Sequence, residues 1–371
     1  MEFRAGGLEN LAMTGFAGIY RGKKVLLTGH TGFKGSWLAT WLLSLGARVV
    51  GVALPPDTAP SHWDLLALDI PEHRVDIRDS SKLGTILSKE NPDIVFHLAA
   101  QPLVRRSYRE PLDTWSTNVM GTANLLEACR RSDALRAAVI VTTDKVYKNR
   151  ELDRGYHEDE TLGGHDPYSA SKAACELVAA SYRSAFCHAP DAPLIATARA
   201  GNVIGGGDWS EDRLIPDLIR AMTDGSPLTI RSPEATRPWQ HVLDCLSGYL
   251  LVGQRLLEGH SRHACAWNFG PERESAVTVG EVLVRLKKRW PELAWRTTDS
   301  AQPHEAALLS LDSGKAKKEL GWRPVWALDD ALEATAQWYR AYLNGGHVES
   351  HGQLAAYVAA ARRSGAVWGG A

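Results

Sequence analysis

The sequence has little cysteine, no long apolar run and no excess of charge of either sign. Its five cysteines are scattered and form no Cys-x-x-Cys pair, which argues against a disulfide framework and a zinc site. No apolar run approaches the roughly 18 residues of a membrane span. The 42 basic and 43 acidic side chains cancel, whereas nucleic-acid-binding modules carry a basic excess. We therefore expect a cytoplasmic protein with no nucleic-acid or membrane partner and no metal.

Short apolar runs alternate with longer amphipathic segments from Lys23 onward. The sequence predicts strands at 24–29, 48–54, 93–100, 137–143 and 194–205, and helices at 34–45, 117–132 and 167–186. Fully apolar strands that alternate with helices are typical of a parallel sheet covered on both faces. We expect an α/β protein with a doubly wound parallel sheet of the Rossmann type and a smaller C-terminal substrate-binding lobe.

The composition changes along the chain and suggests domain boundaries. Residues 1–20 lack the apolar core of a secretory signal and are expected to form a flexible leader. A dinucleotide-binding domain is predicted at 21–201, and 240–270 is expected to return to it. Gly, Pro and charged residues become frequent after Asn202, so a substrate-binding lobe is predicted at 202–239 and 271–345. Residues 346–371 are expected to form a terminal helix and a frayed tail.

A glycine-rich loop, "TGHTGFKG", lies between the first predicted strand and the first predicted helix. Three glycines at this point allow a tight turn, a close approach of the backbone to a pyrophosphate and close packing of the helix on the sheet. An ordinary tight turn is the alternative. His30 and Lys34 either face the phosphate or are solvated. The predicted cofactor contacts here are Gly29, His30, Thr31, Gly32, Phe33, Lys34 and Gly35.

The residues themselves do not decide between NAD and NADP. The second predicted strand has no acid at its tip for the ribose hydroxyls of NAD, only Asp57 nearby, and no arginine placed for NADP. Asp76 and Ile77 are predicted to contact the adenine, although a plain surface aspartate fits equally. Leu98, Ala99 and Ala100 end the next strand, where small side chains leave room for a cofactor or simply pack closely.

Tyr168 and Lys172 are four residues apart in "DPYSASKAACELV", so both lie on one face of the predicted helix. Asp166 fits an N-cap and Pro167 the first helical residue. A neighbouring ammonium lowers the pKa of a tyrosine, so Lys172 is expected to make Tyr168 a usable base. Thr143, at a strand end, is placed to hydrogen-bond the same substrate hydroxyl.

An acid and a base, Asp144 and Lys145, directly follow an apolar strand in "VTTDKVYKN". Adjacent strand residues point to opposite faces, so an ordinary ion pair explains this placement poorly. A surface salt bridge in a loop is the alternative. An acid and a base at one strand end are suited to proton transfer to and from a bound ligand.

The chain resembles the extended short-chain dehydrogenase/reductase family over about residues 21–340. The resemblance rests on "TGHTGFKG", "HLAAQ", "NVMGTANLLEA", "YSASK" and "AGNVIGGGDW", which occur in the family's order. The longer stretches "TDKVY", "GGHDPYSASKAACELV" and "RPWQHVLD" resemble the sugar-nucleotide 4,6-dehydratases that act on CDP-glucose. This resemblance implies NAD as cofactor, CDP-glucose as substrate and a bacterial surface polysaccharide as context. Another dehydratase or a 4-epimerase of the same scaffold is the alternative.

The resemblance also implies roles for the candidate residues. Tyr168 is the base at the sugar hydroxyl, Lys172 also binds the nicotinamide ribose, and Thr143 orients the substrate. Asp144 is the acid at the departing C6 hydroxyl and Lys145 the base at C5, where dehydratases of the dTDP-glucose type carry Asp-Glu.

Further residues are expected to contact the substrate. Arg237 resembles the family's pyrophosphate-binding arginine, and Asn202 resembles a residue that meets the substrate phosphate. The remaining predicted contacts are Gln101, Asp208, Trp209, Arg213 and His304. A lobe-packing tryptophan is the alternative for Trp209, and a surface loop for His304. The family commonly pairs two helices between copies, so a homodimer or homotetramer is expected.

Overall fold

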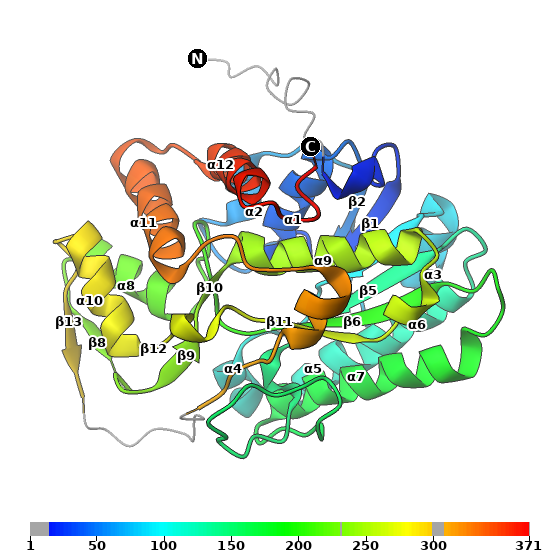
Figure 1. Cartoon of the computed structure of the whole chain (residues 1–371), viewed down its shortest axis with the longest axis horizontal. Coiled ribbons are helices and arrows are strands. Elements are labelled where there is room, and N and C mark those ends of the chain that lie inside the picture. The colour runs from blue at the N-terminus through cyan, green and yellow to red at the C-terminus, as the bar shows by residue number, and fades with distance from the viewer. Residues whose placement is uncertain (1–14, 231, 299–307, 371) are drawn as a thin grey trace.

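The computed structural model describes residues 15–230, 232–298 and 308–370, and its centre is a seven-stranded parallel sheet (Figure 1). Its strand order is β11-β6-β5-β4-β1-β2-β3. The strands are β1 (Lys24–Thr28), β2 (Arg48–Ala53), β3 (Glu72–Arg74), β4 (Ile94–His97), β5 (Ala137–Val141), β6 (Leu194–Ala200) and β11 (Ala266–Phe269). All neighbouring pairs run parallel, which confirms the predicted doubly wound α/β class.

Helices cover both faces of this sheet (Figure 1). One face carries α1 (Phe33–Ser44) and α9 (Val242–Leu257), and the other carries α3 (Ser80–Glu90), α6 (Gly121–Arg130) and α7 (Pro167–Phe186). Alternate residues of β1 enter the two cores: Val25 and Leu27 pack with α1 and α9, and Leu26 packs with α3 and α6. Burial on both faces explains why the strands are apolar throughout.

Smaller elements gather beside the main sheet, at the left of Figure 1. Three two-stranded sheets pair β7 (Val203–Ile204) with β10 (Gln240–His241), β8 (Leu228–Ile230) with β13 (Trp295–Thr297), and β9 (Thr236–Pro238) with β12 (Ala276–Thr278). The larger helices there are α8 (Leu214–Thr223), α10 (Val279–Arg289) and α11 (Leu328–Gly345). Within 240–270, α9 and β11 pack on or pair with the main sheet. The predicted lobe boundaries stay a prediction.

Short helices complete the chain. They are α2 (His62–Leu66), α4 (Val104–Arg109), α5 (Pro111–Trp115), the π-helix η2 (Ser116–Met120) and the 3-10 turn η3 (Asp144–Val146). Single turns are η1 (Phe16–Gly18), η4 (Ser261–His263), η5 (Arg273–Ser275) and η6 (Ala316–Leu320). Within the described part of the chain, no helix combines the length and apolarity needed to cross a bilayer.

The ends of the chain differ from the expected loose leader and frayed tail. Within residues 15–20, Phe16 and Tyr20 belong to the core: Phe16 stacks on Trp368 with 5.2 Å between ring centroids, and Tyr20 donates to the Leu250 carbonyl at 2.6 Å. The predicted terminal helix is α12 (Ser350–Arg363), but Trp368 beyond it is buried. Aromatic packing between the two ends is a long-range contact that no local pattern announces. Residues 1–14 lie outside the described part.

A buried carboxyl group in α9 predicts a pH-dependent stability. Asp244 is fully buried and accepts from Val325 N at 2.6 Å and Tyr357 Oη at 2.7 Å. Burial raises its pKa from 3.8 to about 7. Between these values the native state holds a proton that the unfolded chain has lost, so stability falls as pH rises toward 7. Relative to Asp244→Asn, the wild type should lose about 3 kcal/mol of unfolding free energy between pH 5 and pH 8. Urea unfolding at both pH values tests this, and parallel profiles would contradict it.

Candidate active site

The glycine loop has the shape that a pyrophosphate requires. Gly29 has φ +73°, and a Cβ there would lie 2.6 Å from Ala99 N. A Cβ on Gly35 would lie 2.0 Å from Gly29 O, so α1 can pack this closely only with glycine. At Gly32 the nearest atom to a Cβ is Gly29 O at 3.4 Å, which leaves the outer side of the loop open. The loop and the N-terminus of α1 therefore fit a dinucleotide.

The other side chains of the loop point in different directions. His30 is fully buried: its Nε2 lies 3.0 Å from Glu72 Oε2, and its ring packs on Gly51 and Trp63. Burial lowers its pKa. The expectation of a phosphate-facing or solvated histidine is thus corrected, because this side chain packs inside the protein. Thr31 donates to Leu54 O at 3.0 Å, so its hydroxyl holds the end of β2.

Lys34 lies deeper than a loop residue is expected to lie. Its Nζ is 3.5 Å from Tyr249 Oη in α9 and 5.9 Å from the ring centroid. Burial lowers the pKa of Lys34, and the nearby Asp144 and Asp208 carboxylates oppose that shift. Lys34 is half-buried, and it belongs to the charged groups near the catalytic strand end. Phe33, beside it, packs near Gly205.

The side chains of the residues predicted at the adenine site contact other residues of the protein. The Arg78 guanidinium bonds Asp76 at 2.6 Å and, although partial burial opposes the shift, keeps the pKa of Asp76 below its usual value. Ile77 is buried in the core against Gly121, where a Cβ would lie 2.4 Å from Ile77 Cδ1. The Ile77 side chain therefore packs in the core. Leu98, Ala99 and Ala100 follow β4, and Ala99 lies against Gly29 as close packing requires.

The candidate catalytic set, defined as Thr143, Asp144, Lys145, Tyr168 and Lys172, meets at the carboxyl end of β5. Thr143 caps η3 and donates to Asp144 Oδ1 at 2.9 Å. It also lies close enough to Tyr168 to lower the pKa of the phenol. Thr143, Asp144 and Tyr168 are buried. Carboxyl ends of parallel strands are where α/β proteins place their ligands.

The turn η3 explains how the acid and the base come to lie on one side. Strand β5 ends at Val141, so the strand alternation no longer applies to Asp144 and Lys145. Lys145 Nζ lies 3.8 Å from Asp144 Oδ1, and their side chains are 26% and 2% exposed. A carboxylate buried to this degree is not half of a solvated surface pair. The two side chains do form a salt bridge, but its carboxylate is buried, so a salt bridge exposed in a surface loop does not describe the pair.

The start of α7 places Tyr168 and Lys172 as predicted, but their electrostatics differ. Asp166 accepts from Ser169 N at 2.9 Å and Pro167 begins the helix. Burial raises the pKa of Tyr168 to about 12, and the opposing influences are Thr143 and Arg213. Lys172 donates to Val141 O at 3.2 Å, and burial lowers its pKa. The expectation that Lys172 lowers the pKa of Tyr168 is corrected, because desolvation of the phenol outweighs every nearby cation.

The predicted substrate contacts divide into those beside the catalytic set and those used for packing. Arg213 is close enough to Tyr168 to lower its pKa, and its Nε lies 3.9 Å from Asp208 Oδ2. Trp209 packs on Trp338, Tyr339 and Tyr342, as the lobe-packing alternative states.

Three further predicted contacts occupy different positions. Gln101 is buried, and its amide bonds Leu103 O and Thr114 Oγ1, so its side chain holds the loop after β4 instead of reaching a ligand. Arg237 is buried on β9, and Asn202 is half-buried after β6. His304 lies outside the described residues.

Sequence reasoning missed a set of buried polar residues behind the catalytic strand. Glu176 follows Lys172 by one helical turn, and Arg199 stands inside the apolar strand β6. The two form a buried ion pair at 2.9 Å. An arginine in the middle of "LIATARA" is the signal that could have revealed it, since unpaired charges are almost never fully buried.

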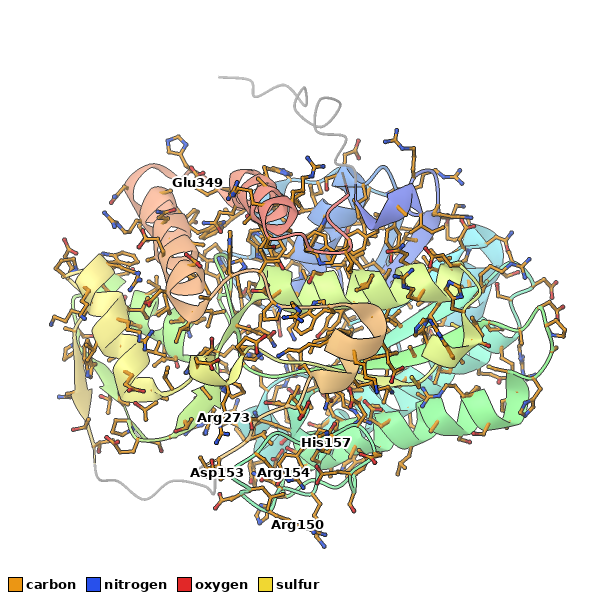
Figure 2. The ribbon with its side chains drawn as sticks, viewed as in Figure 1. Arg150, Asp153, Arg154, His157, Arg273 and Glu349 are labelled. Atoms are coloured by element: carbon orange, nitrogen blue, oxygen red, sulfur yellow. The ribbon has the colours of Figure 1, made fainter. Side chains whose placement is uncertain are left out.

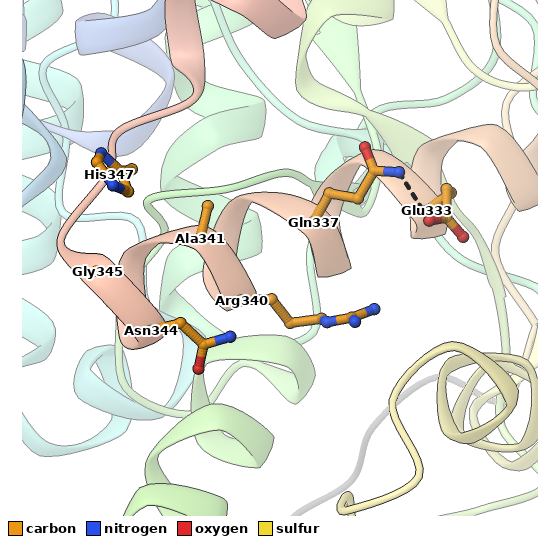
Figure 3. A pocket seen from close by; sticks show the side chains of 7 residues that line it. All are labelled: Glu333, Gln337, Arg340, Ala341, Asn344, Gly345 and His347. Carbon is orange, nitrogen blue, oxygen red and sulfur yellow. Dashed lines mark hydrogen bonds between the residues drawn. The ribbon is translucent and has the colours of Figure 1, made fainter.

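The described residues contain no cluster of three or more His, Cys, Asp or Glu residues that could hold a metal ion. A shallow hollow of about 480 Å³ at the end of α11 is lined by Glu333, Gln337, Arg340, Ala341, Asn344, Gly345 and His347 (Figure 3). No predicted site residue lines this hollow, so it is separate from the candidate catalytic set.

Fold and site together define a dinucleotide-dependent enzyme of the extended short-chain dehydrogenase/reductase kind. A family model described as GDP-mannose 4,6 dehydratase matches residues 26–335, and the chain belongs to this family. It is 46% identical over 333 residues to a CDP-glucose 4,6-dehydratase of Salmonella typhimurium, covering 88% of this chain and 93% of that protein.

Solved structures show the same likeness. The dTDP-glucose 4,6-dehydratase DesIV of Streptomyces venezuelae, solved with NAD bound, is 28% identical with a TM-score of 0.72, covering 86% of this chain and 98% of that one. MoeE5, solved with UDP-glucose and NAD, is 29% identical with a TM-score of 0.73, covering 86% and 99%.

Proposed function

We propose that this chain is an NAD-dependent CDP-glucose 4,6-dehydratase, which forms CDP-4-dehydro-6-deoxy-D-glucose. One observation carries the proposal: an acid and an amine, Asp144 and Lys145, lie 3.8 Å apart beside Thr143, which is also close enough to Tyr168 to lower the pKa of its phenol. A 4-epimerase needs the base Tyr168 at the C4 hydroxyl but not the pair Asp144 and Lys145. The 46% identity to the Salmonella enzyme supports the nucleotide assignment.

The proposed chemistry assigns one proton transfer to each side chain. Tyr168 takes the proton of the C4 hydroxyl while Thr143 bonds that oxygen. Bound NAD would supply the hydride acceptor for C4 and the hydride donor for C6. The ketone at C4 acidifies the C5 proton, and the neutral amine of Lys145 removes this proton. Asp144, in its protonated form, gives a proton to the C6 hydroxyl, which leaves as water. Protonated Lys145 then gives a proton back to C5 as C6 receives the hydride. The open side of the glycine loop would hold the cofactor pyrophosphate, and Lys172 the nicotinamide ribose.

The charge around the site suits a sugar nucleotide. Apart from the acid–base pair Asp144 and Lys145, the site has three cationic side chains, Lys34, Lys172 and Arg213, and one further carboxylate, Asp208. An excess of fixed cations in a cleft attracts an anionic substrate such as a nucleotide diphosphate. Arg237 and Asn202 are proposed to bind the pyrophosphate, and Asp208 and Arg213 the nucleotide.

The test is a substrate comparison read by mass. The purified chain and NAD are incubated separately with CDP-, UDP-, GDP- and dTDP-glucose, and the molecular mass of each product is measured. Loss of one water from CDP-glucose alone supports the proposal. Loss of water from another nucleotide sugar transfers the assignment to that nucleotide, and a product of unchanged mass with a new sugar configuration identifies a 4-epimerase.

We also propose a cytoplasmic homodimer or homotetramer formed through an apolar patch. The patch consists of Leu112 and Trp115 on α5, Met120 on η2 and Leu177 on α7, which are adjacent elements. Leu112 is 82% exposed and Leu177 61%. Exposed apolar side chains gathered on one face favour association with another protein surface.

The double variant Leu112→Arg, Leu177→Arg is expected to halve the mass of the assembly seen by light scattering, because buried unpaired charges oppose association. Val284→Arg, at an exposed apolar position on α10, is the matched control and should leave the mass unchanged. A monomeric wild type, or a double variant of unchanged mass, would contradict this proposal.

A further inference from the structure

The residues just before and just after η3 are both tied to one buried polar network. The network, defined as Thr142, Tyr147, Glu176, Thr197, Arg199 and Asn268, lies behind the carboxyl end of β5. All six residues are buried. Its members come from α7, β6, β11, the residue directly after β5 and the residue directly after η3.

On the upstream side, the network holds Thr142. Its Oγ1 donates to Glu176 Oε1 at 2.5 Å. Glu176 also accepts from Arg199 at 3.0 and 2.9 Å, so each of its oxygens receives a charged donor. Thr142 directly precedes Thr143 in the chain. The hydrogen bond that holds Thr142 therefore also restricts the position of the Thr143 hydroxyl.

On the downstream side, the network holds Tyr147. Arg199 Nη1 donates to Tyr147 Oη at 2.7 Å, and Tyr147 donates to Asn268 Oδ1 at 2.8 Å. The guanidinium also lies 5.0 Å from the centroid of the tyrosine ring. Arg199 therefore links both flanks of the turn that carries Asp144 and Lys145.

Stability alone does not account for this ion pair. Removing two charges from water costs about as much as their attraction returns, and apolar replacements of buried pairs are often neutral. Although burial opposes it, Arg199 keeps the pKa of Glu176 below its ordinary value, so the carboxylate stays charged. A network with fully paired donors and acceptors does, however, fix the orientation of its members.

We propose that Tyr147, Arg199 and Glu176 are positioning residues that hold Asp144 and Lys145 against the C5–C6 edge of the sugar. The proposal rests on the proposed function and deepens it. Tyr147 directly follows the turn η3 and lies outside the candidate catalytic set. Loss of the Tyr147 hydrogen bonds should therefore slow the removal of water more than the oxidation at C4.

The chain offers a matched control on the loop that follows Tyr147. This loop carries Arg150, Asp153, Arg154 and His157 at the lower edge of the molecule (Figure 2). Its Tyr156 stacks on Tyr147 with 5.1 Å between ring centroids and is equally buried. The Tyr156 hydroxyl bonds Arg150 N and Asn149 Oδ1 instead of Arg199.

The experiment compares Tyr147→Phe with Tyr156→Phe on the full chain, with NAD and CDP-glucose. Absorbance of the reduced cofactor at 340 nm is followed by stopped flow, together with kcat, KM and deuterium uptake at C5 from heavy water. For Tyr147→Phe we expect kcat to fall about 10- to 100-fold with KM nearly unchanged, because a small displacement of reacting groups has this effect. Reduced cofactor should accumulate and deuterium uptake should slow.

Tyr156→Phe should behave as the wild type. Thr142→Val loosens the upstream flank and should also accumulate reduced cofactor, which keeps the proposal testable if Tyr147→Phe does not fold. Equal behaviour of the two tyrosine variants, or a slower Tyr147→Phe without reduced cofactor, would overturn the positioning role. A wild type that removes no water from CDP-glucose would instead overturn the proposed function.

Discussion

Lys145→Ala is expected to bind NAD as the wild type does and to lose about 10²- to 10⁴-fold in kcat. Lys145 is the amine nearest the Asp144 carboxylate, at 3.8 Å, and the proposal assigns to it the proton at C5. Oxidation at C4 relies on Tyr168 and Thr143 and should continue. The variant should therefore build up reduced cofactor on mixing with CDP-glucose and fail to exchange the C5 proton with heavy water. Stopped-flow absorbance and mass measurement of the recovered sugar check both effects.

Lys148→Ala is the control for this variant. Lys148 is exposed and follows Lys145 in the same segment, so its loss removes an equal charge from outside the site. It should retain wild-type turnover. Turnover of Lys145→Ala near the wild-type rate would remove Lys145 from the mechanism.

Tyr168→Phe is expected to stop the reaction one step earlier, with no reduced cofactor formed and kcat about 10²- to 10⁴-fold lower. Burial raises the pKa of Tyr168 to about 12, while Thr143 and Arg213 oppose the shift. A base with a raised pKa loses its proton only toward alkaline pH, so kcat/KM of the wild type should rise with pH across the neutral range. Arg213→Ala should move this rise to higher pH, because it removes a cation that favours the phenolate. Initial rates measured from pH 6 to pH 10 check these expectations.

Tyr182→Phe provides the control on the same helix. Tyr182 is half-buried in α7 and lies close to Glu127, away from the catalytic set. Its replacement should change neither the rate nor the pH profile. A pH-independent wild type, or a Tyr168→Phe variant that still forms reduced cofactor, would exclude Tyr168 as the base.

Local sequence patterns were sufficient for the parts of the molecule that depend on neighbouring residues. Helix α7 begins at Pro167 as predicted, because Asp166 caps it and proline suits the first turn. The spacing of Tyr168 and Lys172 places both on one face for the same local reason. Gly29 and Gly35 were identified correctly because only glycine permits the turn and the close packing of α1. Apolar runs buried on both faces indicated the parallel sheet.

Other features depended on contacts between distant segments, and the predictions there were wrong or absent. His30 packs into the protein because Gly51 leaves space for its ring and Glu72 bonds it. Residues 15–20 are ordered by Trp368, which lies at the far end of the sequence. Lys172 does not dominate the pKa of Tyr168, because desolvation is set by the whole surrounding structure. Each effect depends on distance and burial, which periodicity does not report.

The sequence by itself determined the class of fold, the glycine loop and the residue types at the catalytic strand end, since these follow from local geometry and patterning. Only the tertiary structure decided that Asp144 and Lys145 face the same side, because their placement depends on the turn η3 and not on strand alternation. It alone also revealed that Arg199 joins Glu176 to Tyr147 across β6, α7 and the segment after η3. Such groups meet because burial requires each charge and hydroxyl to find a partner, and folding brings that partner from elsewhere in the chain.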